Sequence, residues 1–363
     1  MMTREQACSK KQEALAQYPS VGRVLSSEPY GNGHINDTFL VVTEQGKRYI
    51  LQRVNQVVFP RPDEVMENIL AVTQHIRAGV AREGGDAARC TLSVLPTANG
   101  APFYLDSIGS YWRMYDFVEG TSSKDRVECL QEFVDCAEAF GRFQGQLSDF
   151  DASVLHEAIA NFHNTPVRYE NLMRAIEKDP LGRVAEVQAE IAFVKERAEF
   201  VKTLEKAREA GTLPLRVTHN DTKLNNILFD AETAKPVCVI DLDTVMPGYS
   251  VNDFGDSIRF GANTAAEDET DLSKVSLDLE LYHAYAKGFL AGCDGKLTKT
   301  EVELLPIGAR MMTLECGMRF LTDYIEGDTY FRISRPSHNL DRCRCQFALV
   351  ADMEKKEEQM KLI

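Results

Sequence analysis

The spacing of apolar residues changes near residue 120. Before that point, short apolar runs are bounded by glycine, asparagine, aspartate and serine, a pattern that predicts strands joined by turns. One stretch with helical spacing, residues 62–77, interrupts them. The predicted strands are a lead-in strand before residue 28, the two arms of a glycine hairpin at 29–42, and residues 48–54, 91–95, 103–106 and 111–118.

From residue 125 onward, apolar residues recur every three or four positions, which predicts amphipathic helices whose apolar faces are buried. The predicted helices are residues 127–147, 184–204, 277–290 and 302–324, and a loop is predicted at 162–169. Gly211 is placed to end the second of these helical tracts. The segment 119–123 is rich in small polar residues and predicts a linker. We therefore expect an α+β protein with a β-rich lobe, residues 1–116, and a mainly helical lobe, residues 117–363.

Polar residues with a distinctive spacing interrupt the helical half, next to two short predicted strands. His219 is followed by Asp221, Asn226 lies five residues after that acid, and Asp241 ends the second strand. This is the spacing of a phosphotransferase catalytic loop followed by a metal-binding strand. A plain turn before a strand could also contain consecutive asparagines. The conjunction of loop, strand, turn, strand and terminal acid favours the kinase interpretation.

The chemistry of phosphoryl transfer assigns a role to each residue type. A carboxylate must orient the acceptor hydroxyl and take its proton, which is the role expected of Asp221. Magnesium prefers hard oxygen ligands, so Asn226 and Asp241 are the predicted metal ligands, and Asp243 is a further ligand or an acid behind them. His219 is expected to brace the loop by hydrogen bonds.

A tripeptide downstream, Asp253-Phe254-Gly255, spells the metal-binding sequence of protein kinases. It lies far past the strand pair and opens a predicted helix, so we interpret it as a coincidence. Asp253 is expected to cap that helix, and Asp256 to brace the catalytic loop.

These residues resemble the aminoglycoside phosphotransferase family, whose fold is that of protein kinases. Residues 219–226 and 241–248 are most similar to the bacterial N-acetylhexosamine 1-kinases, and the similarity continues through residues 253–261 and toward both ends. The resemblance implies a two-lobed, protein-kinase-like fold with Mg-ATP held between the lobes. It also implies transfer of the γ-phosphoryl group to the anomeric hydroxyl of N-acetylglucosamine or N-acetylgalactosamine, to give the sugar 1-phosphate.

Several residues of the β-rich lobe are candidates for nucleotide binding. Gly31 and Gly33 would let the hairpin backbone approach a phosphate closely, although a plain hairpin turn also contains glycine. Where kinases carry a phosphate-binding lysine, this strand offers Gln52 or Arg53, and strand alternation allows only one of them to face the nucleotide. Glu67, on the helix that follows, is the candidate partner carboxylate.

The resemblance implies the remaining contacts. In kinase-like folds the adenine lies against backbone groups, which here would be those around Tyr115 and Phe117. Four residues match the sugar-site region of the hexosamine kinases and are the predicted acceptor contacts: His34, Phe260, Arg319 and Tyr330. The alternatives are that the histidine faces solvent, that the arginine pairs with a carboxylate and that the tyrosine packs in the core.

The composition limits the partners. A net charge of −14 argues against nucleic acid or an anionic membrane, since both require a cationic face. The nine cysteines are scattered and odd in number, which favours reduced thiols in a cytoplasmic protein over a disulfide framework or a zinc site. The expected partner is a small sugar, and the expected state is a monomer or weak homodimer.

Two other functions stay open from the sequence. A kinase of the same fold could act on another small alcohol, such as a different sugar, choline, homoserine or an aminoglycoside. A catalytically silent, nucleotide-binding pseudokinase is the alternative prompted by the absent lysine, and the intact Asp221, Asn226 and Asp241 argue against it.

Overall fold

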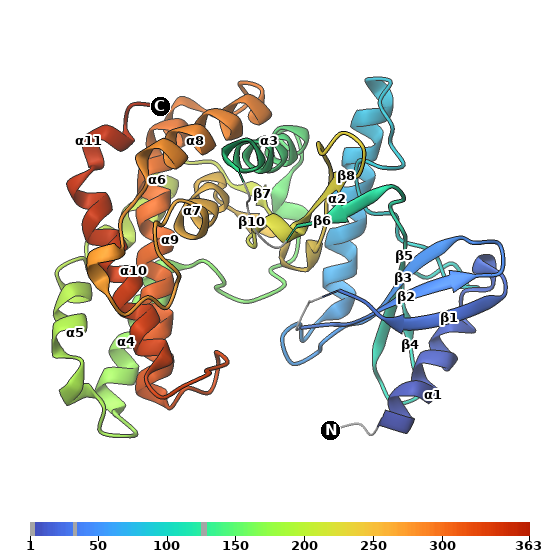
Figure 1. Ribbon diagram of the computed structural model, residues 1–363, viewed down its shortest axis with the longest axis horizontal. Coiled ribbons are helices and arrows are strands. Elements are labelled where there is room, and N and C mark those ends of the chain that lie inside the picture. Colours follow the sequence, from blue (N-terminus) through green and yellow to red (C-terminus); the bar gives the residue numbers. More distant parts are fainter. Residues whose placement is uncertain (1–3, 32–34, 125–128) are drawn as a thin grey trace. The chain divides into compact units, whose positions relative to one another are not determined.

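The protein, seen here in a computed structural model, is described over residues 4–31, 35–124 and 129–363. It has the predicted α+β composition, with strands concentrated in the N-terminal part and helices in the C-terminal part (Figure 1). The chain forms two compact units. Unit 1 comprises residues 1–122, 154–160 and 228–245, and unit 2 comprises residues 123–153, 161–227 and 246–363. The predicted functional boundary between residues 116 and 117 stays a prediction.

Unit 1 is built on an antiparallel sheet with strand order β1-β2-β3-β5-β4 (Figure 1). The sequence predicts these strands because β-branched and aromatic residues alternate there with polar ones. Thr91–Leu95, predicted as a strand, contributes only an isolated bridge between Val94 and Tyr115. The strands are β1 (Val24–Pro29), β2 (Asp37–Thr43), β3 (Arg48–Arg53), β4 (Tyr104–Leu105) and β5 (Tyr111–Asp116).

Two helices and a small second sheet complete unit 1. Helix α1 (Arg4–Leu15) leads into a core that buries Tyr18 against Leu51 and Trp112 of the sheet. Helix α2 (Pro62–Arg82) begins with a proline, which suits the first helical turn, and extends past the predicted end. The second sheet has the order β6-β8-β9, with β6 (Thr121–Ser123), β8 (Ile227–Asp230) and β9 (Pro236–Val239), so part of the predicted linker is a strand.

Unit 2 is mainly helical. The α-helices are α3 (Leu130–Gln146), α4 (Thr165–Lys178), α5 (Gln188–Lys195), α6 (Thr203–Glu209), α7 (Ser250–Gly261), α8 (Leu279–Cys293), α9 (Lys299–Glu326), α10 (His338–Lys355) and α11 (Glu357–Met360), and a short ribbon pairs β7 (Arg216–Thr218) with β10 (Met246–Gly248). The short 3-10 helices of the chain are η1 (Pro19–Val21), η2 (Ala152–Val154), η3 (Val184–Glu186), η4 (Phe200–Lys202), η5 (Leu224–Asn226), η6 (Leu242–Thr244) and η7 (Leu272–Lys274).

Helix α9 is the axis of unit 2, and α4, α7 and α10 pack against it (Figure 1). It starts with a capping box in which Thr298 and Glu301 exchange side-chain and backbone hydrogen bonds. Its contact with α7 is too close for larger residues, because a Cβ on Gly255 would lie 2.3 Å from the carbonyl oxygen of Gly308. The pair of glycines therefore fixes α7 against α9, and both helices carry residues of the site.

Two helical expectations differ from the structure. Residues 162–169, predicted as a loop, include the start of α4, where the Asn164 side chain accepts a hydrogen bond from the Val167 amide and Pro166 occupies the first turn. The predicted helix 184–204 is divided into η3, α5, η4 and α6. Most of its apolar positions are still buried, among them Ile191 and Val201.

Gly211 follows the last of these helices with a φ of 72°, as predicted for a residue that ends a helix. Within the described residues, none of the helices combines the length and apolar character needed to span a membrane.

Candidate functional site

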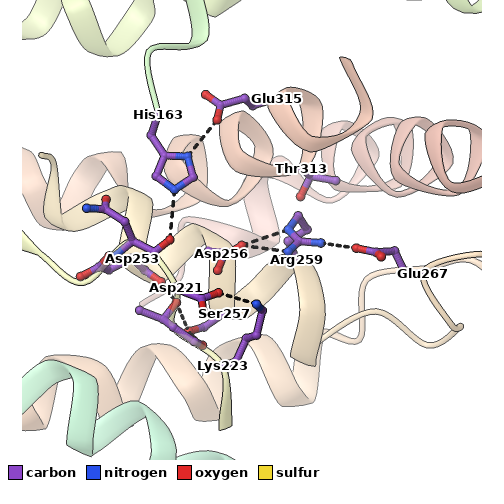
Figure 2. Close-up of polar contacts among 12 residues, drawn as sticks. His163, Asp221, Lys223, Asp253, Asp256, Ser257, Arg259, Glu267, Thr313 and Glu315 are labelled. Carbon is purple, nitrogen blue, oxygen red and sulfur yellow. Dashed lines mark hydrogen bonds and ion pairs between the residues drawn. The ribbon is translucent and has the colours of Figure 1, made fainter. Parts of the chain in front are cut away.

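The predicted base, Asp221, lies in unit 2 in the loop between β7 and η5, and its carboxylate is held from two sides (Figure 2). Asn226 donates from Nδ2 to Asp221 Oδ2 at 3.0 Å and to the Asp221 carbonyl at 2.8 Å. Lys223 Nζ lies 2.6 Å from Asp221 Oδ1. Burial lowers the pKa of Lys223, but the neighbouring carboxylate of Asp221 raises it by more, so the net effect is a raised pKa. The carboxylate is thus fixed in orientation and lies beside a cation.

Asp253 braces this loop and does not cap its own helix, contrary to the prediction. Its carboxylate accepts the backbone N–H groups of His219 and Asn220, each at 2.8 Å, and an amide proton of Gln144 at 2.8 Å. The position that caps α7 is Tyr249. The reason is geometric: Asp253 lies inside the first turn and faces the loop. Burial raises the pKa of Asp253, while the three donors favour its charged form.

His219 packs its ring edge-on against Phe140 and Phe143, with centroid separations of 5.5 Å and 5.9 Å. Its Nδ1 accepts the backbone N–H of Asp221 at 3.3 Å. The imidazole therefore contacts the backbone of the proposed base, and its expected bracing role stays a prediction.

A chain of contacts joins the loop to α9, and the sequence interpretation missed it. His163 contacts Glu315 through Nδ1 at 2.8 Å and the Asn220 carbonyl through Nε2 at 3.3 Å (Figure 2). Thr165 donates to the other oxygen of Glu315 at 2.6 Å. Burial would raise the pKa of Glu315, but His163 and Thr165 lower it on balance. The only signal for these contacts in the sequence was a charged residue, Glu315, among the apolar residues of the predicted helix 302–324.

Asp256, predicted as a second brace, is paired mainly with its own helix. Its Oδ1 accepts from Nε and Nη2 of Arg259 at 3.1 Å and 2.9 Å, and Arg259 also contacts Glu267 at 2.7 Å (Figure 2). Burial opposes the charge of Asp256, but Arg259 lowers its pKa on balance. Its effect on the loop stays a prediction.

The two acids of the predicted metal strand lie in unit 1 and have different surroundings. Asp241 follows β9 in a left-handed conformation, φ 60°, and is exposed. Asp243 is 2% exposed. Its Oδ1 lies 2.6 Å from Arg113 Nη1, and its Oδ2 accepts from Asn36 at 2.6 Å. Both oxygens of Asp243 therefore already contact protein donors, an arrangement that suits an acid behind the ligands.

Arg113 is the buried cation of unit 1. It is 1% exposed and donates from Nε and Nη2 to Gln52 Oε1 at 3.0 Å and 2.8 Å. Burial opposes its charge, yet Asp243 and neighbouring groups hold its pKa above the ordinary arginine value. Of the two candidates on β3, Gln52 faces this cation, whereas Arg53 donates to Asp37 at 2.6 Å.

Glu67 is not the partner of that buried cation. Its carboxylate oxygen lies 2.6 Å from His156 Nε2 and its side chain is 67% exposed, whereas Met66 of the same helix contacts Arg113. The carboxylate that faces the cation is Asp243. The predicted nucleotide-binding role of Glu67 has no support from these contacts.

The other predicted nucleotide contacts are distributed over unit 1. Gly31 has a φ of 78°, which requires glycine or a strained residue, whereas Gly33 and His34 lie outside the described residues. Tyr115 is 4% exposed in the central part of the sheet, and the backbone N–H of Phe117 donates to the Arg48 carbonyl at 3.2 Å. The adenine contact of these two aromatic residues stays a prediction.

The structure brings two of the predicted acceptor residues together. Arg319 Nη2 donates to the hydroxyl of Tyr330 at 3.3 Å, and its guanidinium lies 5.6 Å from the ring centre of Phe162. Both line a cavity of about 270 Å³ in unit 2, together with Arg168. Phe260 is 57% exposed at the end of α7 and is not part of that lining.

Solved structures of several kinases resemble the whole chain. An aminopropanol kinase associated with a microcompartment is 17% identical, with a TM-score of 0.61, and the match covers 98% of this chain and 99% of that one. An aminoglycoside phosphotransferase from Alicyclobacillus acidocaldarius is 14% identical, with a TM-score of 0.61 and coverages of 97% and 96%. An amicoumacin kinase in complex with AMP-PNP and Ca²⁺ is 14% identical, with a TM-score of 0.59 and coverages of 98% and 94%.

These likenesses confirm the predicted protein-kinase-like fold. A sequence model described as the phosphotransferase enzyme family, which includes the aminoglycoside phosphotransferases, matches residues 26–287. That range contains the catalytic loop, both acids after β9 and the bracing Asp253. The chain belongs to the phosphotransferase enzyme family.

Proposed function

We propose that the protein is an ATP- and Mg²⁺-dependent kinase that transfers the γ-phosphoryl group to the anomeric hydroxyl of N-acetylglucosamine or N-acetylgalactosamine. The observation that carries this proposal is the environment of Asp221. Its carboxylate is oriented by Asn226 and lies beside Lys223, on a loop whose backbone is fixed by Asp253. Such preorganisation is what a base in phosphoryl transfer needs.

In the proposed reaction the acceptor hydroxyl donates a hydrogen bond to Asp221 and gives up its proton to that carboxylate. The acceptor oxygen bonds to the γ-phosphorus while the bond from that phosphorus to the bridging oxygen of ADP breaks. An anomeric hydroxyl is more acidic than an ordinary alcohol, so the task of Asp221 is mainly positioning. The sugar leaves as its 1-phosphate.

An amide oxygen and a carboxylate are the donor types that a divalent cation such as Mg²⁺ prefers. Because Asn226 directs its amide nitrogen at Asp221, its amide oxygen is the atom left for a hard metal. Asn226 and Asp241 would hold Mg²⁺, and the ion when bound neutralises phosphate charge. Asp243 would act behind them by holding Arg113. The amicoumacin kinase solved with AMP-PNP and Ca²⁺ supports a nucleotide and a divalent cation as ligands of this fold.

We assign nucleotide binding to the lobe formed by residues 1–116, with Gly31, Gln52, Tyr115 and Phe117 as its contacts. The acceptor site belongs to residues 117–363. There the contacts from the catalytic loop through His163 to Glu315 reach α9, and Arg319 lies one helical turn further along.

Amino alcohols are the second class of acceptor to consider, because the similar structures include choline and ethanolamine kinases. The electrostatics of the cavity disfavour them. Arg319 forms no ion pair with a carboxylate within the described ranges, so its charge would repel a cationic acceptor. A hydroxyl-rich acceptor can instead accept hydrogen bonds from the guanidinium and from Tyr330.

The test is ADP release from Mg-ATP with N-acetylglucosamine, N-acetylgalactosamine, glucose, galactose, choline, ethanolamine, homoserine and kanamycin as acceptors. Phosphorus NMR should show an anomeric phosphate for the two N-acetylhexosamines. Turnover of another acceptor alone would refute an N-acetylhexosamine as the substrate, but it would remain consistent with Asp221 as the base. Nucleotide binding without turnover on any acceptor would favour a pseudokinase.

Two variants separate the base from the acceptor contact. Asp221→Asn should keep stabilisation by ATP and lower kcat by roughly 100- to 10,000-fold. Arg319→Ala should raise KM for the sugar with little change for ATP. Lys299→Ala, at the exposed start of the same helix, is the matched control and should change neither constant. Wild-type turnover by Asp221→Asn, or an unaltered sugar KM in Arg319→Ala, would remove that residue from the site.

A further inference from the structure

The cavity of unit 2 is much more basic than the protein that contains it. It lies between α4, α9 and the segment after α9, which pack side by side (Figure 1). Its lining includes Arg168, Arg174 and Lys178 from α4 and Arg319 from α9. The chain as a whole has a net charge of −14, so this concentration of positive charge is local.

None of these four cations is paired with a carboxylate in the part of the chain that the structure describes. Arg168 donates to the carbonyl of Phe162 at 2.8 Å, and the contact of Arg319 is the hydroxyl of Tyr330. Elsewhere the arginines of unit 2 usually meet acids, as Arg183 does with Asp328 at 2.6 Å. The cavity therefore presents unneutralised cations.

The lining also contains two acids, Asp323 and Glu326, against four cations, so positive charge is in excess. Asp323 accepts the backbone N–H groups of three successive residues, 329–331, at 2.8 to 2.9 Å, and an amide proton of Asn339 at 2.8 Å. Its oxygens are thus used to hold the segment that carries Tyr330. Glu326 is the other acid, and it lies at the exposed end of α9.

The cations also act on one another. Burial lowers the pKa of Arg168, and the nearby charge of Arg319 lowers it further. Residues 168, 171, 174 and 178 are spaced three or four apart, so they share one face of α4 along the cavity. An anion placed between the helices would relieve this repulsion and accept charge-assisted hydrogen bonds.

We propose that the cavity binds an anionic group carried by the acceptor, so that the preferred substrate is an N-acetylhexosamine bearing a carboxylate, sulfate or phosphate. This inference rests on the proposed function. Arg319, one helical turn after Glu315 on α9, and Tyr330, whose hydroxyl accepts from Arg319, contact the sugar. Arg174 and Lys178, further along α4, bind the anionic substituent, and Asn171, which precedes both on the same helix and accepts from Arg174 through Oδ1, adds an amide donor.

The experiment compares kcat/KM for N-acetylglucosamine with that for its 6-sulfate, its 6-phosphate and its 3-O-lactyl ether. At least one anionic sugar should be preferred by about tenfold or more, the scale of charge-assisted hydrogen bonds. Arg174→Ala/Lys178→Ala should lower that preference at least tenfold. The matched control is Lys202→Ala/Lys206→Ala, which removes two cations paired with Glu199 outside the cavity and should leave the preference unchanged.

A second readout, thermal stabilisation without ATP, separates this inference from the proposed function. If no acceptor turns over, but an anionic sugar stabilises the wild type and not Arg174→Ala/Lys178→Ala, the cavity assignment stands and the proposed reaction fails. Preference for the neutral sugar, or an anionic preference unaffected by the double variant, overturns the inference. Equal stabilisation by inorganic sulfate and by the sulfated sugar also overturns it, since the anion would then be a free ligand. Absence of both turnover and stabilisation overturns it as well.

Discussion

The buried pair of Arg113 and Asp243 gives the sharpest test of unit 1. The side chains are 2% and 3% exposed and 2.6 Å apart. Arg113→Met removes the cation and places a flexible apolar side chain beside Met66, which already contacts the guanidinium. The carboxylate of Asp243 is then buried without its counter-charge. Breaking a buried pair from one side costs about 3–5 kcal/mol, so we expect a loss of that size in the free energy of unfolding.

Asp243→Asn should cost less, about 1–3 kcal/mol, because the amide oxygen can still accept from Asn36. The double variant leaves neither charge buried. Its loss should therefore be smaller than the sum of the two single losses by about 2 kcal/mol, within the range measured for directly contacting residues.

Trp112 makes the measurement specific to unit 1. It is the only tryptophan of the chain, it precedes Arg113 on β5, and it is 1% exposed, so its fluorescence in a urea titration reports the unfolding of this sheet. The matched cycle is Arg53→Met with Asp37→Asn, a pair on neighbouring strands whose side chains are 30% and 50% exposed. Its coupling should stay below about 1 kcal/mol. Additive losses for Arg113 and Asp243 would refute the pairing and return Asp243 to the candidate metal ligands.

Three further predictions concern unit 2. Asp253→Asn replaces one carboxylate oxygen by an amide group that cannot accept a hydrogen bond from a backbone N–H, so kcat should fall at least about tenfold. The control Asp278→Asn preserves a helix cap and should keep the wild-type kcat. Equal effects of the two variants on kcat would refute the bracing role of Asp253. Because the folded-state pKa of Glu315 is lowered, its ionised carboxylate contributes to stability above the ordinary glutamate pKa of about 4.3, and this contribution is lost as the pH falls below that value. The difference in Tm between the wild type and Glu315→Gln should therefore shrink from pH 7 toward pH 3. A Tm difference that stays constant over this range would contradict the prediction. Gly255→Ala would place a Cβ 2.3 Å from a backbone oxygen and should lower the free energy of unfolding by about 1–3 kcal/mol. The control Gly79→Ala lies in an open part of α2 and should be neutral or stabilising in the same melting assay.

The sequence predicted the features that depend on local pattern. The strands of unit 1 and the long helices of unit 2 follow from alternation and helical spacing, and α9 differs from the predicted 302–324 only at its ends. The placement of Asp221 and Asn226 in one loop was also predicted, because their five-residue spacing is that of a known catalytic loop, whereas the hydrogen bond between their side chains was not. These inferences need only neighbours along the chain.

Features that depend on distant partners were not predictable. Arg113 was one polar residue in a predicted strand, and nothing near it indicated that Asp243 would neutralise it. Asp253 stood where helix-capping residues stand, and only the tertiary structure turns its carboxylate toward the backbone of the loop. The basic cavity is of the same kind, since residues 162–169 were predicted as a loop and no helix was predicted for the rest of α4, so its cations had no common face until the helix was known.

Two residues of the site show that the motif carries information about backbone conformation even where it does not predict side-chain contacts. Asn220 and Asp241 both have left-handed backbones, with φ of 64° and 60°. Asparagine and aspartate accept this conformation more readily than other non-glycine residues. At Asn220 the turn directs two backbone N–H groups toward Asp253. At Asp241 it ends β9 and starts η6, which brings Asp243 to Arg113. The residue types of the motif at these two positions are thus also ones that a left-handed backbone tolerates, so the short pattern carries information about the backbone as well as about the proposed chemistry.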